Sequence, residues 1–173
     1  MVSVPDSLGY FKSQKTHSYA YKSNNFDKMA SNSTLSIAKL ALADPLFTAF
    51  PITPSSYILD NACGTGVVTS AIKDKYPFAR ILATDIAPGM IETYNSKALQ
   101  GKWENVEAKL LDSKDLKGLQ DGGFRHVIMN FGFMPDKGGP EKAVSEIWRV
   151  LGKGGLAVVT SWAGNSLALL NMN

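Results

Sequence analysis

The ten residues from Tyr57 to Gly66, Tyr-Ile-Leu-Asp-Asn-Ala-Cys-Gly-Thr-Gly, constrain the fold of this chain more than any other segment. An apolar run ends in an acid and is followed by a glycine turn, which predicts a buried strand leading into a helix. Glycine tolerates positive φ and has no side chain, so a ligand can approach the backbone of such a turn closely. The motif becomes specific for a ligand when the next strand supplies an acid.

Strands and helices alternate regularly after this turn. The predicted strands are Tyr57–Asn61, Arg80–Asp85, Val106–Leu111, Phe124–Asn130 and Leu156–Trp162. The predicted helices are Gly66–Lys75, Pro88–Leu99, a short one near Lys114–Leu119, and Pro140–Leu151. This alternation implies right-handed crossovers and an α/β fold with a doubly wound, Rossmann-like sheet. We expect about five strands, mostly parallel.

The N-terminal region has a different pattern. Residues 1–23 are polar and aperiodic, whereas apolar residues recur at helical spacing from Asn24 to about Ala43. Asn32 or Ser33 would cap the second of two helices there. We therefore expect an N-terminal arm and helical lid over residues 1–52, and a core over residues 53–173, in a single domain overall.

Composition limits the function classes. The 173 residues are 45% hydrophobic and 19% charged, as in a soluble globular protein. The net charge is +3, and the first 40 residues hold five Lys against two Asp. A solvated helix face is the favoured explanation for this excess, with a basic lid over an anionic or aromatic small molecule as the alternative; a nucleic-acid footprint would need a clustered basic face.

Cysteine content and the N-terminus bear on the compartment. One cysteine excludes an intramolecular disulfide framework, and no metal-ligand spacing is visible. We find no signal core and no apolar run of the roughly 20 residues that a membrane span needs. A cytoplasmic location without membrane partners is expected.

Polar residues follow each of the first four predicted strands. In open α/β sheets, ligands bind outside the carboxyl ends of the strands. Asp85 follows Gly66 by 19 residues, the spacing at which an acid meets a ribose diol. Thr69 stands where a dinucleotide fingerprint has its third glycine, so a dinucleotide fits worse. The residues at the four strand ends are Asp60, Asp85, Asp112 with Ser113, and Asn130 with Phe131.

Four motifs, in order, resemble the class I S-adenosylmethionine-dependent methyltransferases. They are Asp-x-Ala-Cys-Gly-Thr-Gly from residue 60, Thr-Asp-Ile-Ala-Pro-Gly-Met-Ile from residue 84, Leu-Leu-Asp-Ser-x-x-Leu from residue 110, and Glu-Ile-x-Arg-Val-Leu-x-x-Gly-Gly from residue 146. The small-molecule branch, similar to enzymes of ubiquinone and menaquinone biosynthesis, also has a segment that Phe26-Asp27-Lys28-Met29-Ala30 resembles. The resemblance covers roughly residues 24–162.

The resemblance implies roles for individual residues toward S-adenosylmethionine. The turn from Asp60 to Gly66, with Asn61, Ala62 and Gly64, would hold the methionine part, and Asp60 would face its amino group. Asp85 would bind both ribose hydroxyls, and Ile86 would lie against the adenine. Asp112 would accept from the adenine amine, with the Ser113 amide nearby. Asn130 would line the passage to the transferred methyl together with Phe131, and Phe26 would cover the site.

Catalytic and acceptor-binding residues are less sharply indicated. His17, with Tyr19 nearby, is a candidate general base, and an exposed, uninvolved histidine is the alternative. Phe131, Phe133 and Met134 form either a substrate wall or ordinary loop packing. Cys63 and His126 read better as packed side chains than as reactive groups. Two residues depart from the family pattern: Ala62 replaces its first glycine, and Arg125 stands where an acid is common.

About 11 residues follow Trp162, whereas family members continue with a helix and an antiparallel pair. We therefore expect a sheet that lacks the usual last two strands and leaves the fifth strand as an apolar edge. The explanations are an engineered or proteolytic fragment, a natural short form, a homodimer, or a partner chain that covers the edge. If the short form is natural, we expect a homo-oligomer, by self-association or strand exchange.

The leading functional hypothesis is methyl transfer from S-adenosylmethionine to a small aromatic or polyketide-like biosynthetic metabolite, with S-adenosylhomocysteine as product. Displacement at an activated sulfonium needs alignment in a dry site, and a base is optional. The alternatives are a non-methylating cyclisation or rearrangement on the same fold, and a non-catalytic subunit that docks a partner.

Overall fold

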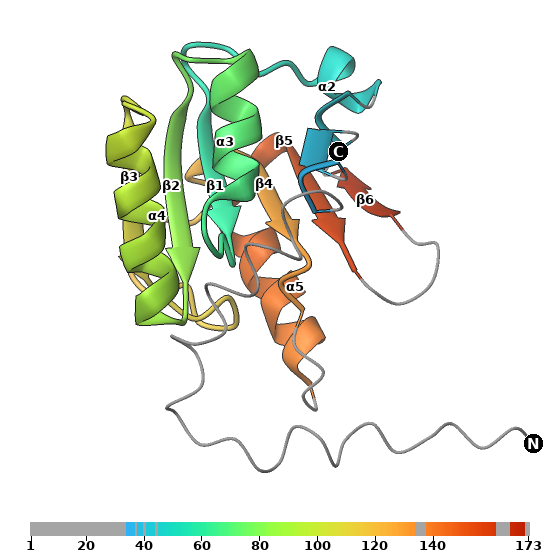
Figure 1. The fold of residues 1–173 in the computed structure, drawn as a ribbon. Coiled ribbons are helices and arrows are strands. Elements are labelled where there is room, and N and C mark those ends of the chain that lie inside the picture. The colour runs from blue at the N-terminus through green and yellow to red at the C-terminus, as the bar shows by residue number, and fades with distance from the viewer. Residues whose placement is uncertain are drawn as a thin grey trace, which may run out of the picture.

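A computed structural model describes residues 34–36, 38–39, 41–43, 45–133 and 138–161, and the backbone of residues 167–171. Its centre is a six-stranded sheet in the order β3-β2-β1-β4-β5-β6 (Figure 1). The strands are β1 (Tyr57–Asn61), β2 (Arg80–Asp85), β3 (Val106–Leu110), β4 (Phe124–Asn130), β5 (Leu151–Thr160) and β6 (Leu167–Asn171). The chain also forms the helices α2 (Leu46–Ala49), α3 (Val67–Lys75), α4 (Pro88–Gln100) and α5 (Gly139–Val150).

The first five strands are parallel, and the strand order reverses beside β1, which pairs with both β2 and β4. This confirms the predicted doubly wound α/β sheet. The expectation of an open fifth-strand edge is wrong, because β6 pairs antiparallel with β5 from Leu156 to Thr160. A partner chain is therefore not needed to cover this edge, and the predicted homo-oligomer stays a prediction without that argument.

Helices cover both faces of the sheet: α3 and α4 lie on one face and α5 on the other (Figure 1). Side chains alternate between the faces along each strand, so neighbouring residues join different cores. Ile58, Ile81 and Ile128 pack with α3, whereas Leu59, Leu82 and Val127 pack with α5. Because both faces are buried, the central strands are almost continuously apolar, as in other parallel sheets.

The described N-terminal residues pack at the amino ends of the strands. Lys75, in the last turn of α3, donates to the Leu42 carbonyl over 3.3 Å. The His126 ring stacks on Phe47 with centroids 5.9 Å apart, and its Nε2 lies 3.0 Å from the Phe50 carbonyl. Burial lowers the pKa of His126, so it is a packed imidazole. The expected N-terminal lid and the division at residue 52 stay predictions.

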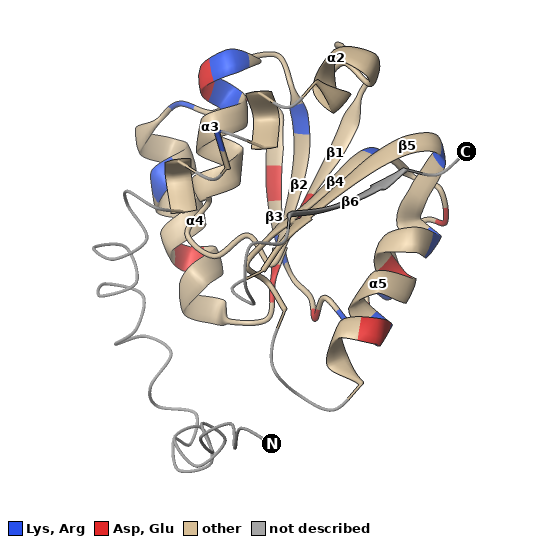
Figure 2. Cartoon of the chain, turned by 90° about the vertical axis from the view of Figure 1, so that its right-hand side faces the viewer, with Lys and Arg blue, Asp and Glu red and all other residues tan. Residues whose placement is uncertain are grey.

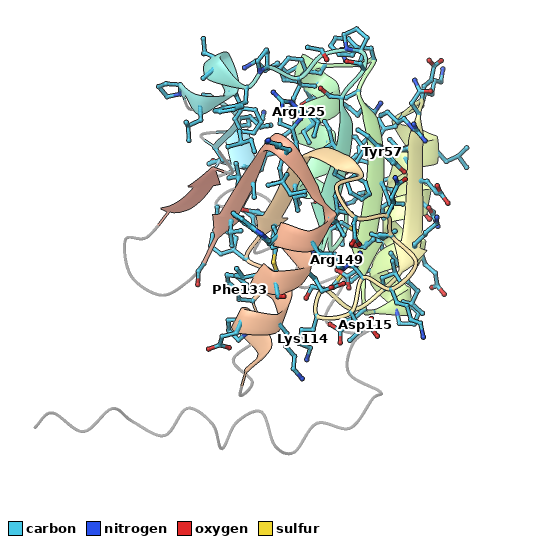
Figure 3. The ribbon with its side chains drawn as sticks, turned by 180° about the vertical axis from the view of Figure 1, so that it is seen from behind. Tyr57, Lys114, Asp115, Arg125, Phe133 and Arg149 are labelled. Carbon is cyan, nitrogen blue, oxygen red and sulfur yellow. The ribbon has the colours of Figure 1, made fainter. Side chains whose placement is uncertain are left out.

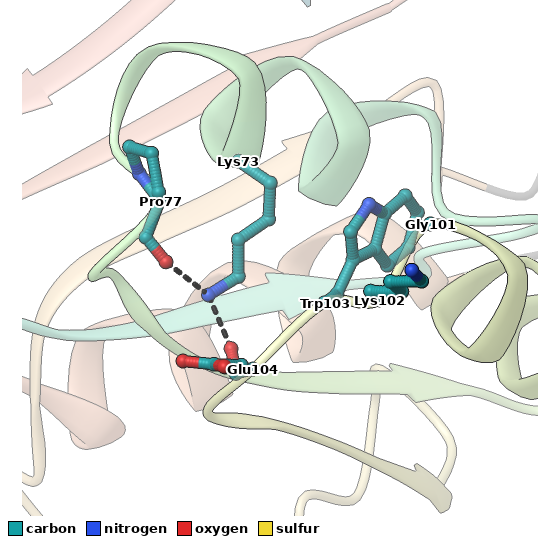
Figure 4. Close-up of a pocket in the computed structure, with 6 residues that line it drawn as sticks. All are labelled: Lys73, Pro77, Gly101, Lys102, Trp103 and Glu104. Carbon is teal, nitrogen blue, oxygen red and sulfur yellow. Dashed lines mark hydrogen bonds between the residues drawn. The ribbon is translucent and has the colours of Figure 1, made fainter.

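A hollow of about 320 Å³ also lies at this end, lined by Lys73, Pro77, Gly101, Lys102, Trp103 and Glu104 (Figure 4). The Lys73 ammonium donates to the carbonyls of Pro77 (3.0 Å), Ala79 (2.5 Å) and Glu104. An ammonium has three protons, and all three are used. Lys73 therefore ties the α3–β2 turn to the α4–β3 turn and keeps no donor for a ligand.

β5 starts five residues earlier than predicted. α5 runs directly into Leu151, and the pairing with β4 shifts between Leu151 opposite Phe124 and Leu156 opposite His126. The glycines between these positions allow the irregularity: Gly154 has φ +70°, and a Cβ on Gly155 would lie 2.8 Å from the Gly152 carbonyl oxygen. Sequence periodicity missed this stretch because a bulge breaks the alternation.

Arg149 of α5 clamps the connection between β3 and β4 (Figure 3). Its guanidinium donates to both carboxylate oxygens of Glu146, at 2.8 and 2.7 Å, and to the carbonyls of Leu119 and Leu116, at 2.9 and 3.1 Å. Glu146 in turn accepts the Leu116 N–H over 2.8 Å. The predicted helix near Lys114–Leu119 is wrong, because side chains of α5 take the backbone groups of Leu116 that a helix would pair.

We predict that Arg149→Met lowers the free energy of unfolding by about 2 kcal/mol, because it leaves two carbonyls and Glu146 without their donor. Urea unfolding followed by circular dichroism measures the change. The exposed Lys142→Met on the same helix is the control and is expected within ~0.5 kcal/mol of wild type. Equal stability of the two variants would show that the clamp contributes nothing.

Candidate functional site

The turn between β1 and α3 lies at the carboxyl edge and contains three residues with positive φ: Ala62 (56°), Gly64 (54°) and Gly66 (86°). A Cβ on Gly66 would lie 2.8 Å from Cδ2 of the buried Tyr94, so only glycine fits there. A Cβ on Gly64 would meet nothing within 4 Å. Gly66 is thus required for packing, whereas Gly64 leaves its backbone open to a ligand.

Ala62 adopts the left-handed conformation without being glycine, which costs roughly 1–2 kcal/mol. A Cβ added to Gly132, which follows β4, would lie only 2.6 Å from the Cβ of Ala62. Ala62 therefore packs directly against the turn that follows β4. The replacement of the family's first glycine is compatible with this fold because the facing residue is itself glycine.

Asp60, at the end of β1, is 1% exposed. Its Oδ2 accepts the backbone N–H of Thr69 over 3.1 Å and the Thr69 hydroxyl over 2.7 Å. Its Oδ1 is buried and has no hydrogen-bond partner among the described residues. Burial raises the pKa of Asp60 to about 7. A carboxylate in this state favours a cation, which would stabilise its ionised form.

Asp85, at the end of β2, joins the glycine turn to the start of α4. Its Oδ2 accepts the Gly64 N–H over 2.8 Å, and its Oδ1 accepts the Ala87 N–H over 2.9 Å. Each carboxylate oxygen keeps a second lone pair, so both oxygens remain able to accept from hydroxyl groups. Burial raises the pKa of Asp85 as well.

The remaining predicted cofactor residues line the same edge. Ile86 is 59% exposed beside Asp85, where an apolar side chain has no packing role. The Leu111 N–H donates to the Asp85 carbonyl over 3.0 Å, which places Asp112 and the partly buried Ser113 next to β2. The Asp112 Oδ1 accepts the Lys114 N–H over 2.9 Å, and its Oδ2 lies 3.9 Å from the Lys114 ammonium.

Asn130 and Phe131 follow β4 at this edge. The Thr160 hydroxyl donates to Asn130 Oδ1 over 2.6 Å, and the Phe131 N–H donates to Thr160 Oγ1 over 3.1 Å. Phe133 packs against the α5 core (Figure 3). Asn61 differs from the others, because its buried side chain accepts from the Thr84 hydroxyl over 3.0 Å and fixes β1 to β2.

The structure thus brings the predicted turn, Asp60, Asp85, Ile86, Asp112 and Asn130 to one edge. His17, Tyr19, Phe26 and Met134 lie outside the described residues, so their roles stay predictions. Cys63 is buried, and burial beside Asp60 and Asp85 raises the pKa of its thiol, which disfavours a nucleophile.

Three residues of the site escaped sequence reasoning: Thr69, Tyr94 and Thr160. In the sequence, Thr69 stands out only because a dinucleotide fingerprint has its third glycine there. In the structure, its hydroxyl donates to the carboxylate of the buried Asp60, nine residues earlier. Tyr94 belongs to the site because it packs against Gly66, a contact that local sequence patterns do not indicate. Thr160 faces Asn130 across two parallel strands, a pairing that aligned strand ends would have indicated.

No group of three or more His, Cys, Asp or Glu side chains among the described residues is arranged to hold a metal ion. None of the helices in that part of the chain has the length and apolar content that crossing a membrane requires.

The two glycines offer a matched test. We predict that Gly66→Ala lowers the free energy of unfolding by about 2–4 kcal/mol, because it adds a clash with Tyr94 to the positive-φ strain. Gly64→Ala, which has the strain but open space, is expected to cost about 1–2 kcal/mol and to weaken binding of S-adenosylhomocysteine at least tenfold. Denaturant unfolding and calorimetric titration measure the two effects. Unchanged ligand affinity in Gly64→Ala would contradict the assignment of the open side of the turn.

The chain is similar in sequence to known proteins of one family. Residues 58–155 match the family model described as a methyltransferase domain. A methyltransferase, ucsB, of an Acremonium species is 30% identical over 139 residues, covering 72% of this chain and 47% of that protein. The demethylmenaquinone methyltransferase of Thermus thermophilus is 36% identical over 103 residues, covering 59% of this chain and 45% of that protein. The chain spans about half the length of these relatives.

A solved structure agrees on the fold. A protein of Methanococcus maripaludis, provisionally assigned as an S-adenosyl-L-methionine-dependent methyltransferase, superposes with a TM-score of 0.69 at 19% identity, covering 88% of this chain and 68% of that one. The predicted cofactor, S-adenosylmethionine, fits the acids, the open turn and the exposed Ile86 at the carboxyl edge. The family prediction is confirmed: the chain belongs to the methyltransferase domain family.

Proposed function

We propose that this chain binds S-adenosylmethionine at the carboxyl edge and transfers its methyl group to a small aromatic or polyketide-like metabolite. The observation that carries the proposal is the pair of buried acids, Asp60 and Asp85, on either side of a turn that is open at Gly64. Both acids have a raised pKa, which a bound cation would lower. A ligand with an ammonium, a sulfonium and a ribose diol suits this arrangement.

Each residue has a part in holding the cofactor. Asp60, through its unpartnered Oδ1, would accept from the amino group of the methionine part. Asp85 would accept from the ribose hydroxyls while its backbone contacts keep the turn in place. Ile86 would cover the adenine, and Asp112 would accept from the adenine amine.

Charges of both signs alternate along α5 (Figure 2), so the surface of that helix offers no basic face to a nucleic acid.

The chemistry asks for alignment more than for acid–base groups. When bound, the cofactor supplies a methyl group already activated on sulfur. The chain has to orient the acceptor in line with that methyl and keep water out. Asn130 and Phe131, fixed by Thr160, are the described residues best placed for this task. A base from His17 stays a prediction.

Two observations support an aromatic acceptor. The half-buried Phe131 follows β4 at the carboxyl edge, where its aromatic side chain can stack on a ring. One relative is a demethylmenaquinone methyltransferase by name, which denotes a quinone-type acceptor for that protein. Cyclisation without methyl transfer and a non-catalytic subunit remain alternative hypotheses. Formation of a methylated product distinguishes methyl transfer from both.

We predict that the wild type transfers a deuterated methyl group from labelled S-adenosylmethionine to at least one member of a panel of phenols and quinols. Mass spectrometry detects the labelled product. Asp85→Asn keeps the size of the side chain but not its charge and is expected to bind S-adenosylhomocysteine at least tenfold more weakly. Lys153→Met, away from the carboxyl edge, is the control. Cofactor binding with no labelled product from any acceptor would favour the alternatives.

A pH dependence follows from Asp60. The pKa of its carboxyl group is about 7 in the free protein, and a bound ammonium lowers it, so ligand binding releases a proton. We predict that the affinity for S-adenosylhomocysteine rises by roughly five- to tenfold from pH 6 to pH 8. Calorimetry in buffers of different ionisation enthalpy measures both the affinity and the released proton. In Asp60→Asn this dependence should vanish; an equally steep profile there would assign it to another group.

A further inference from the structure

Thr160, at the end of β5, faces Asn130 in the parallel register of β4 and β5. The Thr160 residue is 4% exposed. Its hydroxyl donates to Asn130 Oδ1 over 2.6 Å and accepts the Phe131 N–H over 3.1 Å. The Thr160 carbonyl also accepts the Phe131 N–H, over 3.2 Å. One threonine thus contacts the two residues that lie between the cofactor turn and the expected acceptor.

These hydrogen bonds determine which way the Asn130 amide points. A hydroxyl has a single proton, and a buried hydroxyl donates it wherever an acceptor is available. Because the Phe131 N–H uses a lone pair of Oγ1, the Thr160 proton goes to the oxygen of the Asn130 amide. Among the described residues, the hydrogen bond of the Asn130 side chain is the one that its Oδ1 accepts from Thr160, and it does not use Nδ2. The half-buried Asn130 therefore offers a donor at this edge.

The backbone next to Asn130 is strained. Phe131 has φ +57°, a left-handed conformation that costs roughly 1–2 kcal/mol for a residue with a side chain. The two acceptors on Thr160 hold its N–H, and Gly132 packs on Ala62 and Met129 without room for a Cβ. Strain that the surroundings enforce is typical of functional sites, where it fixes side-chain directions.

We propose that Thr160 is a positioning residue for acceptor recognition: it turns Asn130 so that the amide donates to an oxygen of the acceptor. The acceptor class is then an aromatic or polyketide-like molecule with a phenolate, enolate or carbonyl oxygen. This inference rests on the proposed function, because it places the acceptor beside the cofactor. It goes beyond that function by naming the group the site recognises and the residue that sets the selectivity.

The test uses the full chain saturated with S-adenosylhomocysteine and two probes of similar size. The first, 2-hydroxyacetophenone, offers a phenol and a carbonyl oxygen; the second, 2-ethylaniline, offers amine hydrogens. Titration followed by NMR gives both affinities. In Thr160→Val, the affinity for 2-hydroxyacetophenone is expected to fall about tenfold, the effect of one oriented hydrogen bond to a partly buried oxygen. Thr160→Ser keeps the hydroxyl and is expected within about twofold of wild type.

The controls separate orientation from general damage. Both Thr160 variants are expected to bind S-adenosylhomocysteine within about twofold of wild type, and their affinity for 2-ethylaniline should not fall. Asn130→Asp keeps the bond from Thr160 but replaces the donor by an acceptor, so it should also reject 2-hydroxyacetophenone. The side-chain amide resonances of Asn130, identified by their loss in Asn130→Asp, should shift in Thr160→Val and stay in Thr160→Ser.

The outcomes distinguish the two proposals. Wild-type affinity for 2-hydroxyacetophenone in Thr160→Val, or equal wild-type affinity for both probes, overturns the inference and leaves cofactor binding intact. Failure of the wild type to bind S-adenosylhomocysteine overturns the proposed function instead. If Thr160→Val does not fold, the pair Thr160→Ser and Asn130→Asp decides: retained binding of 2-hydroxyacetophenone in Asn130→Asp overturns the donor role.

Discussion

The buried carboxylate of Asp60 is the interaction on which the rest of the site depends. Its bonds to the backbone and hydroxyl of Thr69 hold the first turn of α3 against the end of β1. Burying a carboxylate is costly, and here one oxygen stays without a described partner. The raised pKa means that the folded state binds a proton that the unfolded state has lost between about pH 4 and 7. This group therefore lowers stability as pH rises through that range, the opposite of a salt-bridged acid.

The cost makes physical sense if a cation completes the site. Asp85 lies on the other side of the glycine turn and is also destabilised as an anion by burial. Its Oδ2 accepts the Gly64 N–H and holds the turn, and its Oδ1 accepts the Ala87 N–H at the start of α4. The turn also packs through Ala62 on Gly132, so the proposed cofactor side of the edge is in contact with the proposed acceptor side.

Much of this was predictable from local sequence patterns. β1, β2 and β4 have their predicted bounds because apolar runs with sharp polar ends define them. The acids converge because parallel strands end at one edge. The errors have long-range causes. Arg149 replaces the expected short helix by a clamped turn, and a glycine bulge extends β5. β6 was missed because a five-residue apolar segment near a chain end carries little pattern of its own.

The same distinction explains why cofactor residues were easier to name than acceptor residues. The proposed cofactor turn is contiguous in sequence, and its glycines, its acid and the 19-residue spacing from Gly66 to Asp85 indicate it directly. The proposed acceptor side is made by pairs such as Thr160 and Asn130, 30 residues apart, in which the contact with the partner determines which group is presented. An asparagine is both donor and acceptor, so its sequence position says nothing of which it presents. The register of β4 and β5 brings Thr160 to Asn130, and the hydroxyl proton of Thr160 assigns the amide oxygen to this contact, which would leave the amide donor for the proposed acceptor molecule.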